Sequence, residues 1–230
     1  FEPWRETFYP KGLPQKRELE YAAGRFASIE INGTYYGSQK PESFAKWREE
    51  TPDGFVFSLK ASRFCTNRRV LAEAGPSIEK FLTQGLTELR EKLGPINWQF
   101  APTKKFDPAD FEAFLKLLPN SHEGHALRHA LEVRHESFAA PDFVEMARSH
   151  GAAIVYTDKE EFPEIADPTA PFVYARIMGT RADAALGYDD KSLARWAARA
   201  RQWASGATPT GLDHVENAQP KATPRDVYLY

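Results

Sequence analysis

The sequence predicts a parallel (β/α) barrel, and two features of its 230 residues indicate this fold. Short apolar runs alternate with helical stretches, which is the pattern of β–α–β units in a parallel sheet. A chain of this length fits one α/β barrel or one to two smaller domains. We expect a single barrel domain over residues 1–230, with a flexible segment near 206–224, because so long a structureless loop is usually mobile or functional.

The expected strands are apolar runs bounded by turn residues. Several are apolar almost throughout, as are strands that are buried on both faces of a parallel sheet. They comprise residues 28–32, 55–61, 96–101, 130–135, 152–157, 172–178 and 226–230. We expect these to be seven strands of an eight-stranded TIM-like barrel whose first strand and C-terminal end are missing from the given sequence. A doubly wound open sheet is the alternative.

The expected helices lie between these strands. They comprise residues 15–26, 41–50, 76–93, 107–118, 141–150 and 192–204. Pro41 falls in the first turn of its helix, where its missing N–H costs nothing. Asp107 and Ser192 are candidate N-caps. Gly94-Pro95 is expected to end the helix over 76–93.

The composition limits the cellular compartments and the binding partners that we expect for this protein. The formal charge of −2 argues against a broad electrostatic footprint for nucleic acid, although it does not exclude that partner. Cys65 is the only cysteine, so an internal disulfide is impossible, and this suits a reducing cytosol. No stretch approaches the roughly 18 apolar residues of a membrane span, and no signal peptide opens the sequence. We expect a cytoplasmic protein without a membrane partner, and the oligomeric state stays open.

Polar side chains occur late on one face of successive strands. Strand side chains alternate between two faces, and in a barrel one face meets the helices while the other fills the interior. The polar set comprises Glu30, Asn32, Ser58, Lys60, Asn97, Gln99, Glu132, Arg134, Tyr174 and Arg176, and Asp158 follows the sixth strand. Because barrel active sites lie at the carboxyl ends of the strands, this pattern predicts a polar site there.

The charges of this set nearly cancel. Three acids, Glu30, Glu132 and Asp158, oppose three bases, Lys60, Arg134 and Arg176. Paired charges tolerate burial, so one interpretation is an ion-pair network that serves structure alone. We favour a pocket for a polar small molecule, because a core that served only stability would use Val, Ile and Leu.

Each charged residue has a candidate role and a simpler alternative. Glu30 and Glu132 could act as general acid and base, or serve as counter-ions for the cations. Lys60 could form a Schiff base if its pKa were lowered, or make an ion pair or a phosphate contact. Arg134 and Arg176 fit clamps for anions or hydroxyl groups, because guanidinium binds oxygens in a fork.

Five further residues complete the candidate site. Asp158 is grouped with the catalytic candidates. Asn32 and Gln99 could orient a ligand through amide hydrogen bonds. Tyr35 and Tyr188 follow strand ends, where their rings could stack on a ligand or anchor a loop.

Motifs for other chemistries are missing from the sequence. The histidines show no H-E-x-x-H or other metal spacing, and there is no Gly-rich phosphate loop. No G-x-S-x-G nucleophile elbow occurs. Lysine and arginine interleave with the acids, which argues against a metal. We expect no metal and no cofactor.

Three functions stay open at this point. The first is an enzyme, of hydrolase or isomerase type, that acts on a sugar or a phosphorylated small molecule by acid–base chemistry. The second is a binding protein, without catalysis, for a nucleotide or a nucleic-acid end. The third is a metal-dependent phosphoesterase or isomerase-like barrel that uses Glu30, Glu132 and Asp158.

An ordered set of short motifs resembles the YecE-like family, also called domain of unknown function 72. The set runs over most of the chain. It includes Trp4, Phe8-Tyr9-Pro10, Ile29-Glu30-Ile31-Asn32, Thr34-Tyr35-Tyr36, Lys60, Gln99, Ala130-Leu131-Glu132-Val133-Arg134-His135, Asp158, Tyr174, Arg176, Gly179, Tyr188 and Trp196. The resemblance implies a TIM-like barrel with a strand before Trp4 and further sequence after Tyr230. It implies a site region but no reaction.

The sequence departs from this family at two positions. Asn67 and Met178 stand where the family usually has histidine. If those histidines transfer protons in relatives, this chain lacks that step. The segment 206–224 also looks longer than is usual in the family.

Overall fold

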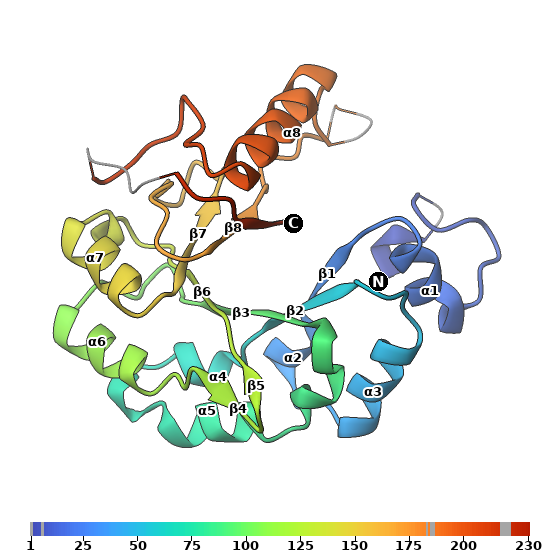
Figure 1. The fold of residues 1–230 in the computed structure, drawn as a ribbon, viewed down its shortest axis with the longest axis horizontal. Coiled ribbons are helices and arrows are strands. Elements are labelled where there is room, and N and C mark those ends of the chain that lie inside the picture. Colours follow the sequence, from blue (N-terminus) through green and yellow to red (C-terminus); the bar gives the residue numbers. More distant parts are fainter. Residues whose placement is uncertain (1, 6, 183, 185–186, 217–221) are drawn as a thin grey trace.

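A sheet of seven parallel strands forms the centre of the computed structural model, which describes residues 2–5, 7–182, 184, 187–216 and 222–230 (Figure 1). The strands are β1 Ser28–Ile31, β2 Val56–Lys60, β3 Leu93–Gln99, β6 His129–Glu132, β7 Ala153–Thr157, β8 Phe172–Arg176 and β9 Asp226–Leu229. They follow one another in this order, and each pair of neighbours is parallel. A doubly wound sheet would reverse its order at a switch point, so that alternative is wrong.

The sheet curls into a nearly closed barrel. The Tyr174 hydroxyl on β8 donates to Glu30 Oε2 on β1 at 2.5 Å. Tyr230 directly follows β9, and its hydroxyl donates to Ser58 Oγ on β2 at 2.8 Å. These contacts join the two ends of the strand order across the interior. In the described residues β1 and β9 are the unpaired edges, and the TIM-like fold predicted from the sequence is confirmed.

Helices cover the outside of the strands, as Figure 1 shows. The α-helices are α1 Glu18–Ala23, α2 Gly33–Tyr36, α3 Pro41–Glu49, α4 Arg63–Thr66, α5 Gly75–Leu82, α6 Pro108–Lys116, α7 Pro141–Ser149 and α8 Asp190–Ala204. The 3-10 helices are η1 Glu2–Trp4, η2 Gln15–Arg17, η3 Leu71–Glu73, η4 Leu86–Lys92 and η5 Glu136–Phe138. A small hairpin, β4 Ser121–His122 with β5 His125–Ala126, precedes β6. No described helix is long and apolar enough to cross a membrane.

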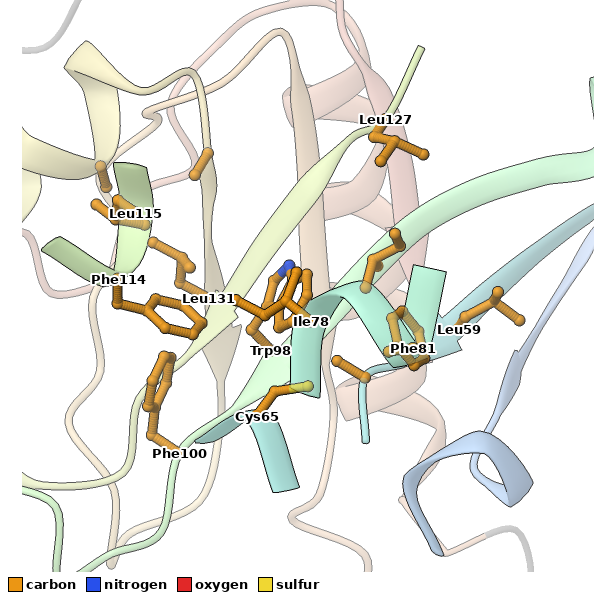
Figure 2. Packing of buried hydrophobic residues seen from close by; sticks show 14 of the residues in the cluster. Leu59, Cys65, Ile78, Phe81, Trp98, Phe100, Phe114, Leu115, Leu127 and Leu131 are labelled. Atoms are coloured by element: carbon orange, nitrogen blue, oxygen red, sulfur yellow. The ribbon is translucent and has the colours of Figure 1, made fainter. Parts of the chain in front are cut away.

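Outward-facing strand side chains make the main core with these helices. Leu59, Trp98 and Leu131 are fully buried, and Figure 2 shows them beside Phe81 and Phe114 from α5 and α6. Burial of each such side chain contributes about 1.5–3 kcal/mol. The alternation read from the sequence is confirmed, because the residues with the opposite parity face the barrel interior.

The interior changes character along its length. Its apolar part comprises Ala130, Ala153, Val155, Phe172, Tyr174 and Tyr228. The polar part follows towards the carboxyl ends of the strands, where Glu132, Arg134 and Arg176 meet. The apolar part therefore lies on the amino-terminal side of the polar part and packs against it.

The single helix predicted over 76–93 is wrong, because the chain breaks at Gly85. Helix α5 ends at Leu82, and Gly85 takes a φ of 100° before η4 begins. A Cβ on Gly85 would lie 2.7 Å from Pro41 Cα, so glycine is required for this close approach. Gly94 lies inside β3 rather than ending a helix, and a Cβ there would meet Val56 Cγ1 at 2.5 Å.

Other boundaries also differ from the sequence prediction, and two of them concern the site or the cap of a helix. The helix expected over 15–26 ends at Ala23, and β3 begins at Leu93 rather than at residue 96. Asp189, not Ser192, caps α8, and its carboxylate accepts from the Ser192 N–H at 2.7 Å. Strand β6 ends at Glu132, so Arg134 lies beyond the strand and can fold back over it. For α8, aspartate and serine are about equally favourable N-cap residues, so the sequence alone does not distinguish Asp189 from Ser192 as the cap.

The segment expected to be flexible, 206–224, is described in part. Residues 217–221 lie outside the described residues. Before them, Asp167 accepts from the N–H groups of Val215 and Glu216 at 2.7 and 3.0 Å, and Glu164 accepts from the Asp213 N–H at 3.1 Å. These hydrogen bonds hold residues 213–216 against the segment that precedes β8.

Candidate functional site

Glu132 is the centre of the polar cluster. It ends β6 and is fully buried. Its carboxylate accepts from Arg134 Nε at 2.9 Å, from Arg176 Nη1 at 2.8 Å and from Asn97 Nδ2 at 2.8 Å. Burial raises the pKa of Glu132, but Arg176, Arg134, the Asn97 hydrogen bond and Lys60 together outweigh it and hold this pKa below its usual range. Glu132 is therefore an ionised hub that orients two guanidinium groups.

Glu30 supplies the second carboxylate of the cluster. Its Oε1 lies 3.4 Å from Arg176 Nη2 and 3.7 Å from Lys60 Nζ. Its Oε2 accepts from Asn97 Nδ2 at 3.0 Å. Because this nitrogen lies 3.0 Å from Glu30 Oε2 and 2.8 Å from Glu132 Oε2, the two oxygens are at most 5.8 Å apart. Asn97 and Arg176 bridge the two carboxylates and occupy the space between them.

Arg134 faces the opening of the barrel. Its Nη2 donates to Gln99 Oε1 at 2.7 Å while its Nε holds Glu132. The guanidinium also lies 4.7 Å from the ring centroid of Phe162, which follows β7. The side chain keeps 19% of its surface exposed, so a ligand at the barrel mouth can reach it.

Lys60 ends β2 and is almost buried, with 8% of its side chain exposed. Among the described residues, its ammonium donates no hydrogen bond; Glu30 Oε1 lies at 3.7 Å and the Tyr35 ring centroid at 5.7 Å. Burial lowers the pKa of Lys60 more than Glu30 raises it, and Arg176 lowers it further. Lys60 is thus a desolvated amine with donors available to a ligand.

The cluster carries an excess of positive charge. Lys60, Arg134 and Arg176 share the two carboxylates of Glu30 and Glu132. Tyr174 adds no charge, because burial and the neighbouring Glu30 raise its pKa well above the usual value. The arrangement would be neutralised by one further anion.

Asn32 and Tyr35 lie at the edge of the cluster. Asn32 is exposed just after β1 and, with Glu30, lines a cavity of about 450 Å³. The Tyr35 hydroxyl accepts from Asn67 Nδ2 at 3.2 Å. Asn67, one of the two departures from the family pattern, therefore orients the ring that lies beside Lys60.

Asp158 and Tyr188 form a separate group. Asp158 accepts from the Gly179 N–H at 3.0 Å, from the Met178 N–H and from the Tyr188 hydroxyl at 2.8 Å. Burial and this hydrogen bond raise the pKa of Tyr188. The group ties the loop after β8 to the end of β7 and lines a neighbouring cavity of about 640 Å³. In the described chain, neither Asp158 nor Tyr188 forms a hydrogen bond or an ion pair with Glu30 or Glu132, so these two predicted residues lie outside the charged cluster.

The described residues contain no group of three His, Cys, Asp or Glu side chains placed to hold a metal ion. Asp158 accepts from backbone N–H groups and from the Tyr188 hydroxyl. The oxygens of Glu30 and Glu132 contact the cations of the cluster and accept from Asn97, and Glu30 also accepts from Tyr174. The metal-dependent alternative thus has no donor set in this part of the chain.

Three residues of the site, Asn97, Tyr174 and Phe162, have no role assigned from the sequence, although the first two belong to the polar set of the strands. Asn97 and Tyr174 share the interior parity of Gln99 and Arg176, so the alternation contained a signal for them. Phe162 lies in a loop, and no periodicity marks it.

Fold and site define an α/β barrel protein with a buried charged cluster at the carboxyl ends of its strands. The chain belongs to the family described as protein of unknown function DUF72, whose model matches residues 1–226. It is similar to UPF0759 protein YecE of Escherichia coli strain K12, with 31% identity over 136 residues, 58% of this chain and 47% of that protein. It is also similar to UPF0759 protein YunF of Bacillus subtilis, with 26% identity over 150 residues, 63% of this chain and 52% of that protein. The chain thus spans about half the length of these relatives.

Two solved structures share the fold. A DUF72 family protein from Thermotoga maritima matches with a TM-score of 0.73 and 20% identity, covering all of this chain and 87% of that one. A DUF72 family protein from Enterococcus faecalis matches with a TM-score of 0.67 and 18% identity, covering 92% of this chain and 84% of that one.

Proposed function

We propose that the barrel mouth binds a small polar molecule that carries a phosphate or carboxylate group, and that Lys60 exchanges a proton with it. The observation that carries this proposal is the Lys60 ammonium, which is almost buried and donates no hydrogen bond within the described chain. An ammonium that has lost most of its hydration and is only partly compensated by a carboxylate at 3.7 Å carries a cost in free energy. An anionic ligand would accept from it and remove this cost.

The two arginines fit the same ligand. Arg134 and Arg176 are fixed by Glu132, so their guanidinium planes are oriented before a ligand arrives. Each keeps part of its side chain exposed, 19% and 16% respectively. A preoriented fork loses little entropy when it binds a carboxylate or a phosphate.

The proton-transfer role belongs to Lys60 with Glu30 rather than to Glu132. Glu132 is stabilised as an anion by two arginines, so it is a poor proton donor near neutral pH. Lys60 has a lowered pKa, and Glu30 is the carboxylate closest to it at 3.7 Å. A catalytic amine works best when its pKa approaches the working pH.

Glycoside hydrolysis by the two glutamates is less well supported. Their oxygens are at most 5.8 Å apart, which overlaps the roughly 5–5.5 Å separation of retaining glycosidases. However, Asn97 and Arg176 already lie between these carboxylates. A sugar oxygen has no room there without displacing them.

Thermal unfolding with a small ligand panel tests the proposal. The panel contains glucose 6-phosphate, gluconate and uncharged glucose, and the proteins are the natural sequence, Lys60→Met and Arg134→Lys. Arg148→Lys is the matched control, because Arg148 pairs with Glu216 at 2.7 Å outside the barrel mouth. A charged ligand at 100 times its Kd should stabilise the natural protein and the control by about 2.7 kcal/mol.

The same ligand should stabilise Lys60→Met and Arg134→Lys much less. Equal stabilisation of Lys60→Met and the natural protein would contradict the proposal, as would a glucose effect equal to that of both charged sugars.

A further inference from the structure

A second region of positive charge lies beside the barrel mouth, between the loops that follow β2 and β3. It is a cavity of about 600 Å³ whose basic lining residues are Arg68, Arg69, Lys104 and Lys105, and we call it the cationic pocket. Its described lining includes no aspartate or glutamate. The chain as a whole carries a formal charge of −2, so this concentration of one sign is local.

One of the four basic residues, Lys104, has a structural role in the pocket. Lys104 Nζ donates to Asp110 Oδ2 and to the Arg69 carbonyl, both at 2.8 Å. Asp110 also accepts from the Ala72 N–H at 3.0 Å. These contacts fasten the loop after β3 to the loop after β2, so the pocket has a fixed shape.

The other three cations are not neutralised. In the part of the chain that the structure describes, Arg68, Arg69 and Lys105 form no ion pair with a carboxylate. Arg68 donates to the Glu73 carbonyl, while its buried Nε has no partner among the described residues. Like charges in one cleft repel one another and focus a field that attracts an anion.

The pocket offers donors that suit a phosphoryl group. Guanidinium groups present forked N–H donors that match phosphate oxygens, and charge-assisted hydrogen bonds of this kind are the strong ones. Asn67 lines the pocket as well, and it adds an amide group. It also connects the two regions, because its Nδ2 donates to the Tyr35 hydroxyl, and the Tyr35 ring lies beside Lys60.

We propose that the cationic pocket is an anion-binding site for a phosphoryl group, separate from the charged cluster inside the barrel. Arg68, Arg69 and Lys105 contact the phosphoryl oxygens, and Lys104 holds the two loops in position. This site does not depend on the function proposed for the barrel mouth, because it uses none of the same side chains.

Isothermal titration with inorganic phosphate at constant ionic strength tests the site. The variant is Arg69→Gln with Lys105→Gln, because both side chains are exposed and their replacement should leave stability nearly unchanged. The matched control is Lys191→Gln with Arg201→Gln, which removes the same charge from exposed positions on α8. We expect the natural protein and the control to bind phosphate alike, and the pocket variant to bind it at least about tenfold more weakly.

Two further measurements show whether the pocket recognises a phosphoryl group on a larger molecule, and distinguish this site from the site proposed at the barrel mouth. Adenosine monophosphate should also bind and adenosine should not, if the phosphoryl group is what the pocket recognises. Lys60→Met should keep the phosphate affinity of the pocket, whatever happens at the barrel mouth. Absence of phosphate binding by the natural protein would overturn the inference, and so would equal losses in the pocket variant and the α8 control.

Discussion

Each end of the barrel buries one lysine, and the two lysines differ in the hydrogen bonds that their ammonium groups donate. Lys92 lies at the amino end, just before β3, and its ammonium donates to the carbonyls of Arg48 and Thr51, both at 2.7 Å. Lys60 lies at the carboxyl end of β2, and in the described chain its ammonium donates no hydrogen bond. The Lys92 ammonium is thus satisfied by backbone carbonyls of the protein. The Lys60 ammonium keeps its hydrogen-bond donors free of partners in the described chain.

This difference follows the usual division of labour in such barrels. The amino end of the strands generally serves stability, and the carboxyl end carries the chemistry. Lys92 satisfies carbonyls where α3 ends and the chain turns towards β2, so it has a structural role. Lys60 has a buried charge that is only partly compensated by Glu30.

The largest effect is expected at the carboxyl end, from Glu132→Gln. This change keeps the shape but removes the anion that holds Arg134 and Arg176. Loss of one partner from a buried charge network costs about 3–5 kcal/mol. Urea unfolding measures the free energy, with Glu145→Gln as the exposed control. A loss below about 1 kcal/mol would mean that Glu132 is not the hub of the cluster.

The comparison of the lysines predicts effects of different size for one substitution. Lys92→Met should destabilise by about 2–3 kcal/mol, because it leaves buried carbonyls without their donor. Lys60→Met should change stability by less than about 1 kcal/mol or stabilise the protein, because it removes a desolvated charge. Urea unfolding of the two variants measures both values. Equal destabilisation by the two substitutions would contradict the view that Lys92 stabilises the fold and Lys60 does not.

The smallest effect is a dependence of stability on pH. The pKa of Glu132 is lower in the folded protein than in the unfolded chain, where it is about 4.3. Its stabilisation is therefore complete above that value and is lost as the pH falls through the folded pKa. Urea unfolding from pH 7 to pH 3 should show a steeper loss for the natural protein than for Glu132→Gln. Parallel profiles would assign the acid sensitivity to other carboxyl groups.

Strand alternation explains why so much of the site was predictable. Glu30, Lys60 and Arg176 were placed in the interior by parity alone, and their ion pairs confirm that placement. Parity cannot say how far a loop residue lies from the cluster. Asp158 has the right position in sequence, but its oxygens are taken by Gly179 and Tyr188.

The sequence by itself determined the fold class, the interior face of each strand and the excess of charged groups at the strand ends. These depend on a period of two along each strand, which is local and needs no knowledge of other strands. Only the tertiary structure decided that Asn97 bridges two carboxylates, that Gly85 breaks a helix against Pro41, and that Lys92 is satisfied while Lys60 is not. Those outcomes depend on register and on contacts between distant segments, which a one-dimensional pattern does not contain.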